Sequence, residues 1–344
     1  SQGQTLDRMV VDLSGGMFSF GQLYVALSRC TSLSGLVLKR PVLPKDLKTD
    51  KRVVRFLRQA TADDGVRRYC GIGVLTVGDE GRMSRPRPVE FAVAFDDGTA
   101  VTTLVNPQRD LADARRRFGI TVSDVLLAPT LAEVWQFVAP MLAGCTPVGA
   151  GIDETLGLID FELKRLGLVV ATPLGVEVRA ARSAVGTALE LARTALDAFL
   201  ASGTGDSGAL AFDEPETAES ATGCLVSRDA EVPTPTAAHL PALSALLDVS
   251  RPVGALLLGR SMPEALPDTP WHAAARFSVA DQLRVAASRV PMTDEALQRL
   301  RAVEGYLGVE IGEVSAAPVG DDIASALTPG ARVCFTGTAE DDCG

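Results

Sequence analysis

The sequence predicts an α/β protein with more than one domain. Its 344 residues exceed what one hydrophobic core usually serves. Short apolar runs typical of strands alternate with segments of helical periodicity in residues 1–65, and again in residues 66–201. Such alternation is typical of sheets covered by helices, and this predicts the α/β class.

The first segment, residues 1–65, begins with a turn-prone SQGQT and a short strand at Val10, Val11 and Leu13. An apolar run from Phe18 to Leu27 follows, and residues 34–38 predict another strand. Strand, loop, helix and strand in this order are typical of α/β cores that handle nucleotides. The following stretch, DLKTDKRVVRFLRQ, predicts a solvated amphipathic helix, with a DNA-backbone contact as the alternative.

Three strings in this segment are more specific than its periodicity. SQGQT, MVVDL and GQLYVALSRCTSLSGLVLKRPV closely resemble motifs V and VI of the RecD-like superfamily 1B DNA helicases, which include bacterial relatives of the eukaryotic Pif helicases. The resemblance covers residues 1 to about 58. It implies that residues 1–65 are the C-terminal part of a RecA-like helicase lobe.

The resemblance also implies roles for individual residues. The motif VI arginine of that family, here Arg29, reaches the γ-phosphate of ATP held by the other lobe, where a planar guanidinium stabilises developing charge. Arg29 is therefore the expected catalytic residue. The implied nucleotide-binding residues are Gly3, Thr5, Gln22, Tyr24 and Arg29, and the implied DNA contacts are Ser1 and Gln2. For Leu23, Tyr24 and Leu27 the alternative is an ordinary apolar helix face.

The phosphate-binding loop of such a motor is missing from the sequence. No GxxxxGK[ST] string occurs, so the backbone cradle and the lysine that hold ATP are absent. We therefore expect a fragment of an ATP-dependent DNA helicase acting in replication, recombination or repair. ATP and Mg²⁺ are expected in the complete parent protein, and no cofactor or activity is expected for this chain alone.

The second segment predicts strands over 70–77, 89–95 and 100–105, with a hairpin turn at Asp97 and Gly98. Thr130 and Glu133 form a capping box before an apolar helix. The later pattern predicts a strand over 146–150, a helix over 154–166, a strand over 168–171 and a helix over 183–200.

This order resembles the ribonuclease H-like fold, and TLVNP, FGIT, APTLAEVW and VGAGIDETLGLIDFELKRLG resemble DnaQ-type DEDD exonucleases over residues 66–201. Those enzymes hold two metal ions with four carboxylates and use a histidine as general base. The resemblance places other residue types at all five positions, namely Gly73, Leu75, Thr155, Arg182 and Thr187. No metal site is expected, and an inactive exonuclease domain is predicted.

Two alternatives remain open for this domain. A working 3′–5′ exonuclease would need relocated acids, for which the candidates are Asp79, Glu80, Asp153, Glu154 and Glu190. Ordinary surface or helix N-terminal acids are the simpler interpretation. The other alternative is a non-catalytic scaffold or binding module in DNA repair.

The last part of the chain begins with an acidic linker over 202–237, rich in Gly, Ser, Thr and Pro. Helical periodicity then covers 238–327, where Trp271 is expected to pack and His272 to lie on the surface. PGARVCFTGTAEDDCG resembles the first strand of a BRCT domain, which would begin at 328–344.

The charge distribution bears on partners. The net charge is −10, but residues 1–58 carry +6, residues 59–200 carry −4 and residues 201–344 carry −12. Only the first part has the sign that suits phosphates, so we expect DNA, as a single strand or fork, to bind there. Repair proteins are expected to bind the C-terminal half. The sequence shows no membrane-spanning run or leader, which predicts a cytoplasmic, nucleoid-associated bacterial protein.

Overall fold

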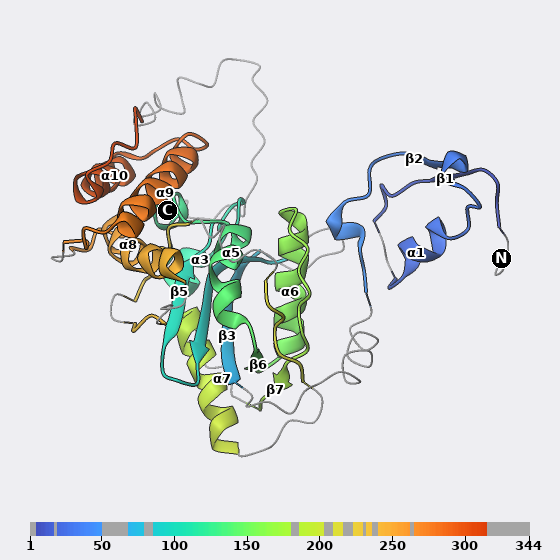
Figure 1. Cartoon of the computed structure of the whole chain (residues 1–344), viewed down its shortest axis with the longest axis horizontal. Coiled ribbons are helices and arrows are strands. Elements are labelled where there is room, and N and C mark those ends of the chain that lie inside the picture. Colours follow the sequence, from blue (N-terminus) through green and yellow to red (C-terminus); the bar gives the residue numbers. More distant parts are fainter. Residues whose placement is uncertain are drawn as a thin grey trace, which may run out of the picture.

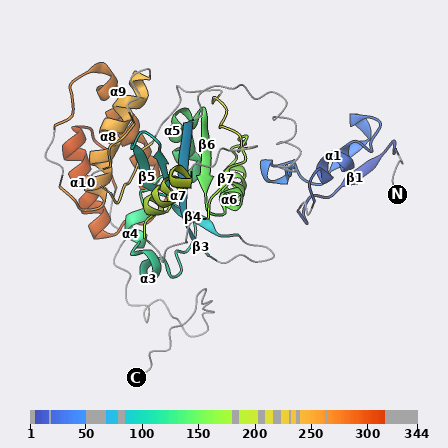
Figure 2. The ribbon, with the colours of Figure 1, turned by 90° about the horizontal axis from the view of Figure 1, so that it is seen from below.

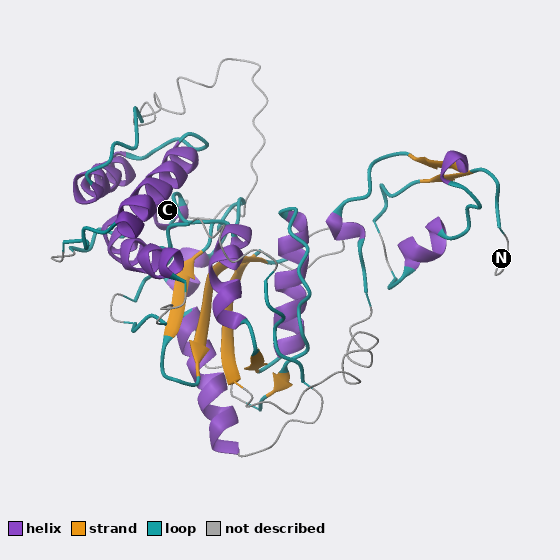
Figure 3. Ribbon diagram, in the orientation of Figure 1, coloured by secondary structure: helices purple, strands orange, loops and turns teal. Residues whose placement is uncertain are grey.

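The computed structural model describes residues 5–16, 19–49, 68–78, 85–179, 186–202, 209–215, 223–229, 232–235, 240–261 and 265–314. Several residues with expected roles lie outside these ranges, namely Ser1, Gln2, Gly3, Asp79, Glu80 and Arg182, together with the BRCT-like residues 328–344. The structure confirms the α/β class: strands and helices alternate over most of its length (Figure 3).

The N-terminal unit, residues 5–49, lies apart from the main sheet in two views at right angles (Figures 1 and 2). Its strands β1 (Met9–Val11) and β2 (Leu36–Leu38) pair in parallel. Between them lie α1 (Gln22–Leu27) and the short 3₁₀ helix η1 (Leu33–Gly35), and η2 (Pro44–Asp46) follows. Val11, Leu13 and Leu23 form a small core of their own.

The main sheet has five strands in the order β5, β4, β3, β6, β7. Their bounds are β3 Arg68–Val77, β4 Arg87–Phe95, β5 Ala100–Leu104, β6 Cys145–Gly149 and β7 Val176–Glu177. Strand β4 is antiparallel to β3 and β5, whereas β6 is parallel to β3 and to β7. The predicted hairpin is confirmed, since Gly98 turns with a φ of 85° and the Phe95 amide donates to Thr99 O at 2.9 Å.

Helices cover both faces of this sheet (Figure 2). The helices of this region are α3 (Ala114–Phe118), α4 (Val122–Val125), α5 (Leu131–Leu142), α6 (Ile152–Arg165) and α7 (Ala188–Ser202), of which α7 packs on one face and α5 on the other. The predicted capping box is present at α5, where the Thr130 amide donates to Glu133 Oε2 at 2.6 Å.

The two faces of the sheet differ in residue size. Gly71 and Gly73 of β3 pair with Ala94 and Ala92 of β4, and residues paired in this way share a face. Helix α7 packs on that face, because the small residues let its backbone come close to the strand. Phe91 points to the opposite face, where its ring lies 6.4 Å from that of Trp135 in α5.

The strand predicted over 168–171 is wrong. Gly167 ends α6 with a φ of 89°, and the Leu168 amide turns back to donate to Leu163 O at 2.9 Å. This is a Schellman-type helix end, which uses the apolar run as a cap. The strand that joins the sheet is β7 instead, and its Glu177 carboxylate accepts from the amides of Gly151 and Ile152 at the start of α6.

The described parts of the predicted linker pack on the core. Phe212 is 6% exposed, its amide donates to Cys145 O at 3.0 Å, and its ring lies 5.8 Å from that of Trp135. The Leu104 amide donates to Val226 O at 2.8 Å, and the Ala100 amide to Pro233 O at 3.0 Å. Although the composition of this segment is polar, single apolar residues such as Phe212 anchor it against the sheet.

The helical segment consists of α8 (Pro241–Leu257), α9 (Pro270–Ala287) and α10 (Asp294–Leu307). Its buried residues belong to the same hydrophobic cluster as those of the five-stranded sheet. The expectation for the aromatic pair is reversed: Trp271 is 54% exposed, whereas His272 is 13% exposed and bonds Asp248 at 2.9 Å. Within the described ranges, no helix has the length and apolar character needed to cross a membrane.

Candidate functional site

The two helicase-like segments of the N-terminal unit are held together through their backbones. The Leu6 amide donates to Arg29 O at 2.7 Å, and the Thr31 amide donates to Leu6 O at 3.1 Å. The Thr31 hydroxyl also donates to Asp7 Oδ1 at 3.1 Å. The segment that follows Thr5 and the segment that carries Arg29 are therefore one local structure.

A glycine makes this close approach possible. A Cβ built on Gly35 would lie 1.8 Å from the carbonyl oxygen of Asp7. Gly35 ends η1, directly before β2, so the chain returns past Asp7 with no room for a side chain. The glycine in the string SLSGLVL is therefore required by packing, in addition to being part of the helicase-like motif.

The residues with implied roles are placed differently around α1. Arg29 is partly buried just after the helix, and Thr5 is exposed next to Leu6. Gln22 Oε1 accepts from the Ser19 amide at 3.3 Å, at the start of the helix. Tyr24 is 75% exposed, whereas Leu23 is 7% exposed. The apolar-face interpretation therefore holds for Leu23 and is wrong for Tyr24.

A buried ion pair between Arg40 and Asp46 links two segments of the N-terminal unit. Both Arg40 Nη atoms bind the Asp46 carboxylate at 2.7 Å, and Nη2 also donates to Leu13 O at 2.6 Å. Asp46 is 2% exposed. The Arg40 guanidinium lowers the pKa of the Asp46 carboxyl below its ordinary value, although burial acts in the opposite direction. This pair fixes η2 against β1.

A cleft of about 1390 Å³ lies between this unit and the main sheet. It is lined by β3, α6, α7 and the η2 region, and Lys164 Nζ of α6 donates to Leu47 O at 2.9 Å. Gly73, Leu75 and Thr155 line it, so the structure brings together three of the five exonuclease-like positions. The acids Asp153, Glu154 and Glu190 line the same part of the cleft.

Position 73 has no room for a metal-binding side chain. A Cβ on Gly73 would lie 1.8 Å from the carbonyl oxygen of Ala188 in α7. Leu75 is 5% exposed and pairs with Glu90 across the strands. The Thr187 amide donates to Glu190 Oε2 at 2.9 Å and the Glu190 amide donates to Thr187 Oγ1 at 3.2 Å, as in a capping box. The helix backbone thus occupies the space above β3.

The nearby acids are engaged with the backbone. Asp153 Oδ1 accepts from the Gly175 amide at 3.2 Å, and Glu190 Oε2 accepts from the Thr187 amide. Among the residues that the structure describes, no three His, Cys, Asp or Glu side chains gather closely enough to hold a metal ion.

Sequence reasoning missed a buried ion pair on the same face. Glu90, 1% exposed in β4, binds Arg228 Nε and Nη2 at 2.7 and 2.6 Å. Its Oε2 also accepts from the Ala188 amide at 2.9 Å, at the start of α7. Arg228 Nη1 donates to Phe118 O at 2.7 Å. No local signal could have paired residues 138 positions apart.

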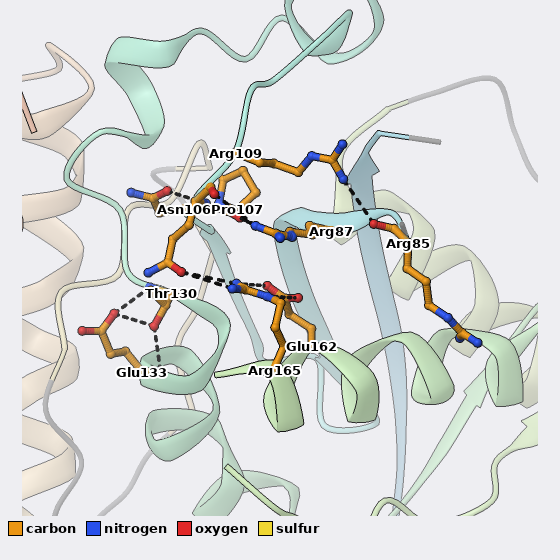
Figure 4. Close-up of polar contacts among 10 residues, drawn as sticks. Arg85, Arg87, Asn106, Pro107, Arg109, Thr130, Glu133, Glu162 and Arg165 are labelled. Atoms are coloured by element: carbon orange, nitrogen blue, oxygen red, sulfur yellow. Dashed lines mark hydrogen bonds and ion pairs between the residues drawn. The ribbon is translucent and has the colours of Figure 1, made fainter. Parts of the chain in front are cut away.

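Sequence reasoning also missed an arginine cluster at the end of β3 (Figure 4). Three segments supply it: the start of β4 through Arg85 and Arg87, the loop after β5 through Arg109, and the end of α6 through Arg165. Arg165 binds the buried Glu162 at 2.7 Å and approaches Gln108 Oε1 at 3.4 Å. Arg87 donates to the carbonyl oxygens of Pro107 and Gln108, each at 3.0 Å.

Comparison with known proteins bears on part of the chain. Over 58 residues, 17% of its length, the chain is 48% identical to the ATP-dependent DNA helicase PIF1 of Emericella nidulans. The matched segment spans 8% of that helicase, and the similarity supports a link to the DNA helicases. No model of a protein family and no solved structure matches the chain.

Proposed function

We propose that this chain is part of an ATP-dependent DNA helicase, in which its N-terminal unit places Arg29 at the nucleotide held by another lobe. The observation that carries the proposal is the backbone pairing of Leu6 with Arg29 and Thr31, at 2.7 and 3.1 Å. It joins a segment that resembles motif V to one that resembles motif VI. The 48% identity to a DNA helicase over 58 residues supports the same proposal.

Arg29 would act through charge. A guanidinium that reaches the γ-phosphate stabilises the charge that develops on phosphoryl transfer, and such arginines contribute roughly 10³ to 10⁵ in rate. The chain itself does not fit ATP, because its sequence has no phosphate-binding loop. ATP and Mg²⁺ would therefore be held by the lobe that supplies this loop, with Thr5, Gln22 and Tyr24 beside Arg29.

Residues 66–201 would serve this helicase as an inactive exonuclease-like domain. The strand order and the antiparallel strand β4, which lies between β5 and the central β3, resemble those of the ribonuclease H-like fold. The close packing of α7 on Gly73 argues against a working metal site. Repair-protein contacts through the C-terminal half, a BRCT domain from residue 328 and a nucleoid-associated location remain proposals that rest on sequence resemblance and charge.

The test is ATP hydrolysis by the longer gene product that contains this chain. With single-stranded DNA present, Arg29→Ala is expected to lower kcat about 10³-fold with little change in KM for ATP. Arg8→Ala, which removes an exposed charge from the same unit, is the matched control and is expected to hydrolyse ATP at the parent rate. Unchanged hydrolysis by Arg29→Ala, or a longer product without GxxxxGK[ST], would contradict the proposal.

A further inference from the structure

Acidic and basic side chains line different parts of the cleft along α6. Asp153 and Glu154 lie at the start of the helix and Glu190 near the start of α7, beside the exonuclease-like positions. Basic residues line the other half of the cleft: Lys45, Lys48, Arg85, Arg117 and Lys164. Lys164 is bound to Asp160 at 3.1 Å and Arg117 to Asp113 at 3.7 Å, which leaves Lys45, Lys48 and Arg85 as the main source of positive charge.

The basic half continues into the arginine cluster. The carbonyl oxygen of Arg85 accepts from Arg109 Nη1 at 3.2 Å, and Lys164 is followed on α6 by Arg165. Among the described residues, Arg85, Arg87 and Arg109 are paired with no carboxylate. Burial and the neighbouring Arg165 and Arg109 lower the pKa of Arg87, although the nearby Glu162 acts in the opposite direction. A protein with a net charge of −10 thus concentrates cations at one place.

Aromatic rings accompany these cations. The Arg85 guanidinium lies 5.0 Å from the centroid of the partly exposed Phe161 ring, whereas Arg117 lies 4.6 Å from the ring of Phe118, which is buried in the core. Phe20 of the N-terminal unit also lines the cleft and is 57% exposed. A positive groove with aromatic platforms is the arrangement that binds single-stranded nucleic acid, since phosphates pair with the cations and bases stack on the rings.

We propose that the basic half of this cleft, between η2 of the N-terminal unit and the β3–β4 end of the sheet, binds single-stranded DNA without cleaving it. Lys48 contributes from one side and Arg85 with Phe161 from the other, so the strand bridges the two units. The acids near Gly73 keep phosphates out of the other half. This inference rests on the proposed work on DNA, but it uses none of the residues implied at the nucleotide.

The experiment measures the affinity of the 344-residue chain for a fluorescent oligo(dT), by anisotropy, over a series of salt concentrations. The variant Lys48→Ala/Arg85→Ala removes two phosphate contacts. The slope of log affinity against log salt should fall by about 1.4, and affinity at 0.1 M salt should fall about 25-fold. Arg260→Ala/Arg289→Ala removes the same charge from exposed positions outside the cleft and should bind like the parent chain.

A second variant separates stacking from charge. Phe161→Leu keeps an apolar side chain and should lower affinity about fivefold or more, with an unchanged salt slope. Thermal unfolding at the parent temperature would show that each variant is folded.

Three results would overturn the assignment. They are parent-like binding by Lys48→Ala/Arg85→Ala, no salt-dependent binding by the parent chain, and displacement of the oligonucleotide by polyglutamate at equal charge concentration. None of them bears on the helicase proposal, because ATP hydrolysis with Arg29→Ala tests that separately.

Discussion

The backbone of Gly73 lies directly against the carbonyl of Ala188: a Cβ on residue 73 would be 1.8 Å from that oxygen. Strand β3 and helix α7 are therefore in contact at a position where the resemblance to exonucleases expects a carboxylate. The contact depends on a glycine in the strand and alanines in the helix, so the helix has to move before any larger residue fits.

The first prediction concerns this contact. Gly73→Ala should destabilise the protein by about 1–3 kcal/mol or more, because its methyl group meets backbone atoms that cannot turn away. A lower midpoint of thermal unfolding, by roughly 3–10 °C, is expected for a protein of this size. Gly305→Ala, in α10 with nothing within 4 Å, is the control and should leave stability equal or higher. Equal midpoints for Gly73→Ala and the parent chain would refute this packing.

The second prediction concerns catalysis. With Mg²⁺ or Mn²⁺, the chain should not digest a 3′-labelled single strand, because the carboxylates in the described part of the chain are too dispersed for a pair of metal ions. Introducing Gly73→Asp and Leu75→Glu should not create digestion, since the first change displaces α7. Metal-dependent digestion that disappears in Asp153→Asn would instead favour the relocated acids.

The third prediction concerns the buried pair of Glu90 and Arg228. Arg228→Met should destabilise the protein by about 3–5 kcal/mol, because it leaves Glu90 charged and buried. The double variant Glu90→Gln/Arg228→Met should be more stable than Arg228→Met alone, since the amide oxygen can still accept from Ala188 and no charge remains. Urea unfolding at pH 7 compares them. A double variant less stable than the single one would contradict this explanation.

The fourth prediction is a pH dependence in the N-terminal unit. The folded pKa of Asp46 is below its ordinary value of 3.8, so the unfolded chain binds the proton more readily. The stabilisation by Arg40 is therefore fully present above about pH 4 and is lost as the pH falls through the folded pKa. NMR signals of the Leu13 and Leu43 methyl groups should report this loss. In Asp46→Asn the free energy of unfolding of the N-terminal unit should be lower at pH 7. If the methyl signals of that variant change at acid pH as they do in the parent chain, the mechanism is contradicted.

Local sequence patterns predict many elements of the fold. Strands β3, β4 and β5, the hairpin at Gly98 and the cap at Thr130 are set by neighbours in sequence, and all were predictable. The error over 168–171 arose because a helix end after Gly167 and a strand can use the same apolar run. The packing of Phe212 was hidden by its polar surroundings, since composition averages out single anchors.

The candidate sites were predictable only where a motif is contiguous. Arg29 is identified by resemblance to a motif, and its proximity to Leu6 is visible only after folding. The cations of the arginine cluster come from the start of one strand, two loops and a helix end, and no spacing rule joins Arg85 to Arg165. The same holds for Glu90 and Arg228, whose meeting depends on the path of the chain after α7.

The contacts of Val226 and Pro233 with the sheet have one more consequence. Strand β5 lies at one edge of the sheet, and its Ala100 and Leu104 amides donate to the carbonyl oxygens of Pro233 and Val226. These bonds occupy groups that an open edge would offer to another chain, and open edges promote aggregation. A shortened protein that ends at residue 201 would lose this protection together with the partner of Glu90. The structural unit built on this sheet therefore extends at least to Pro233.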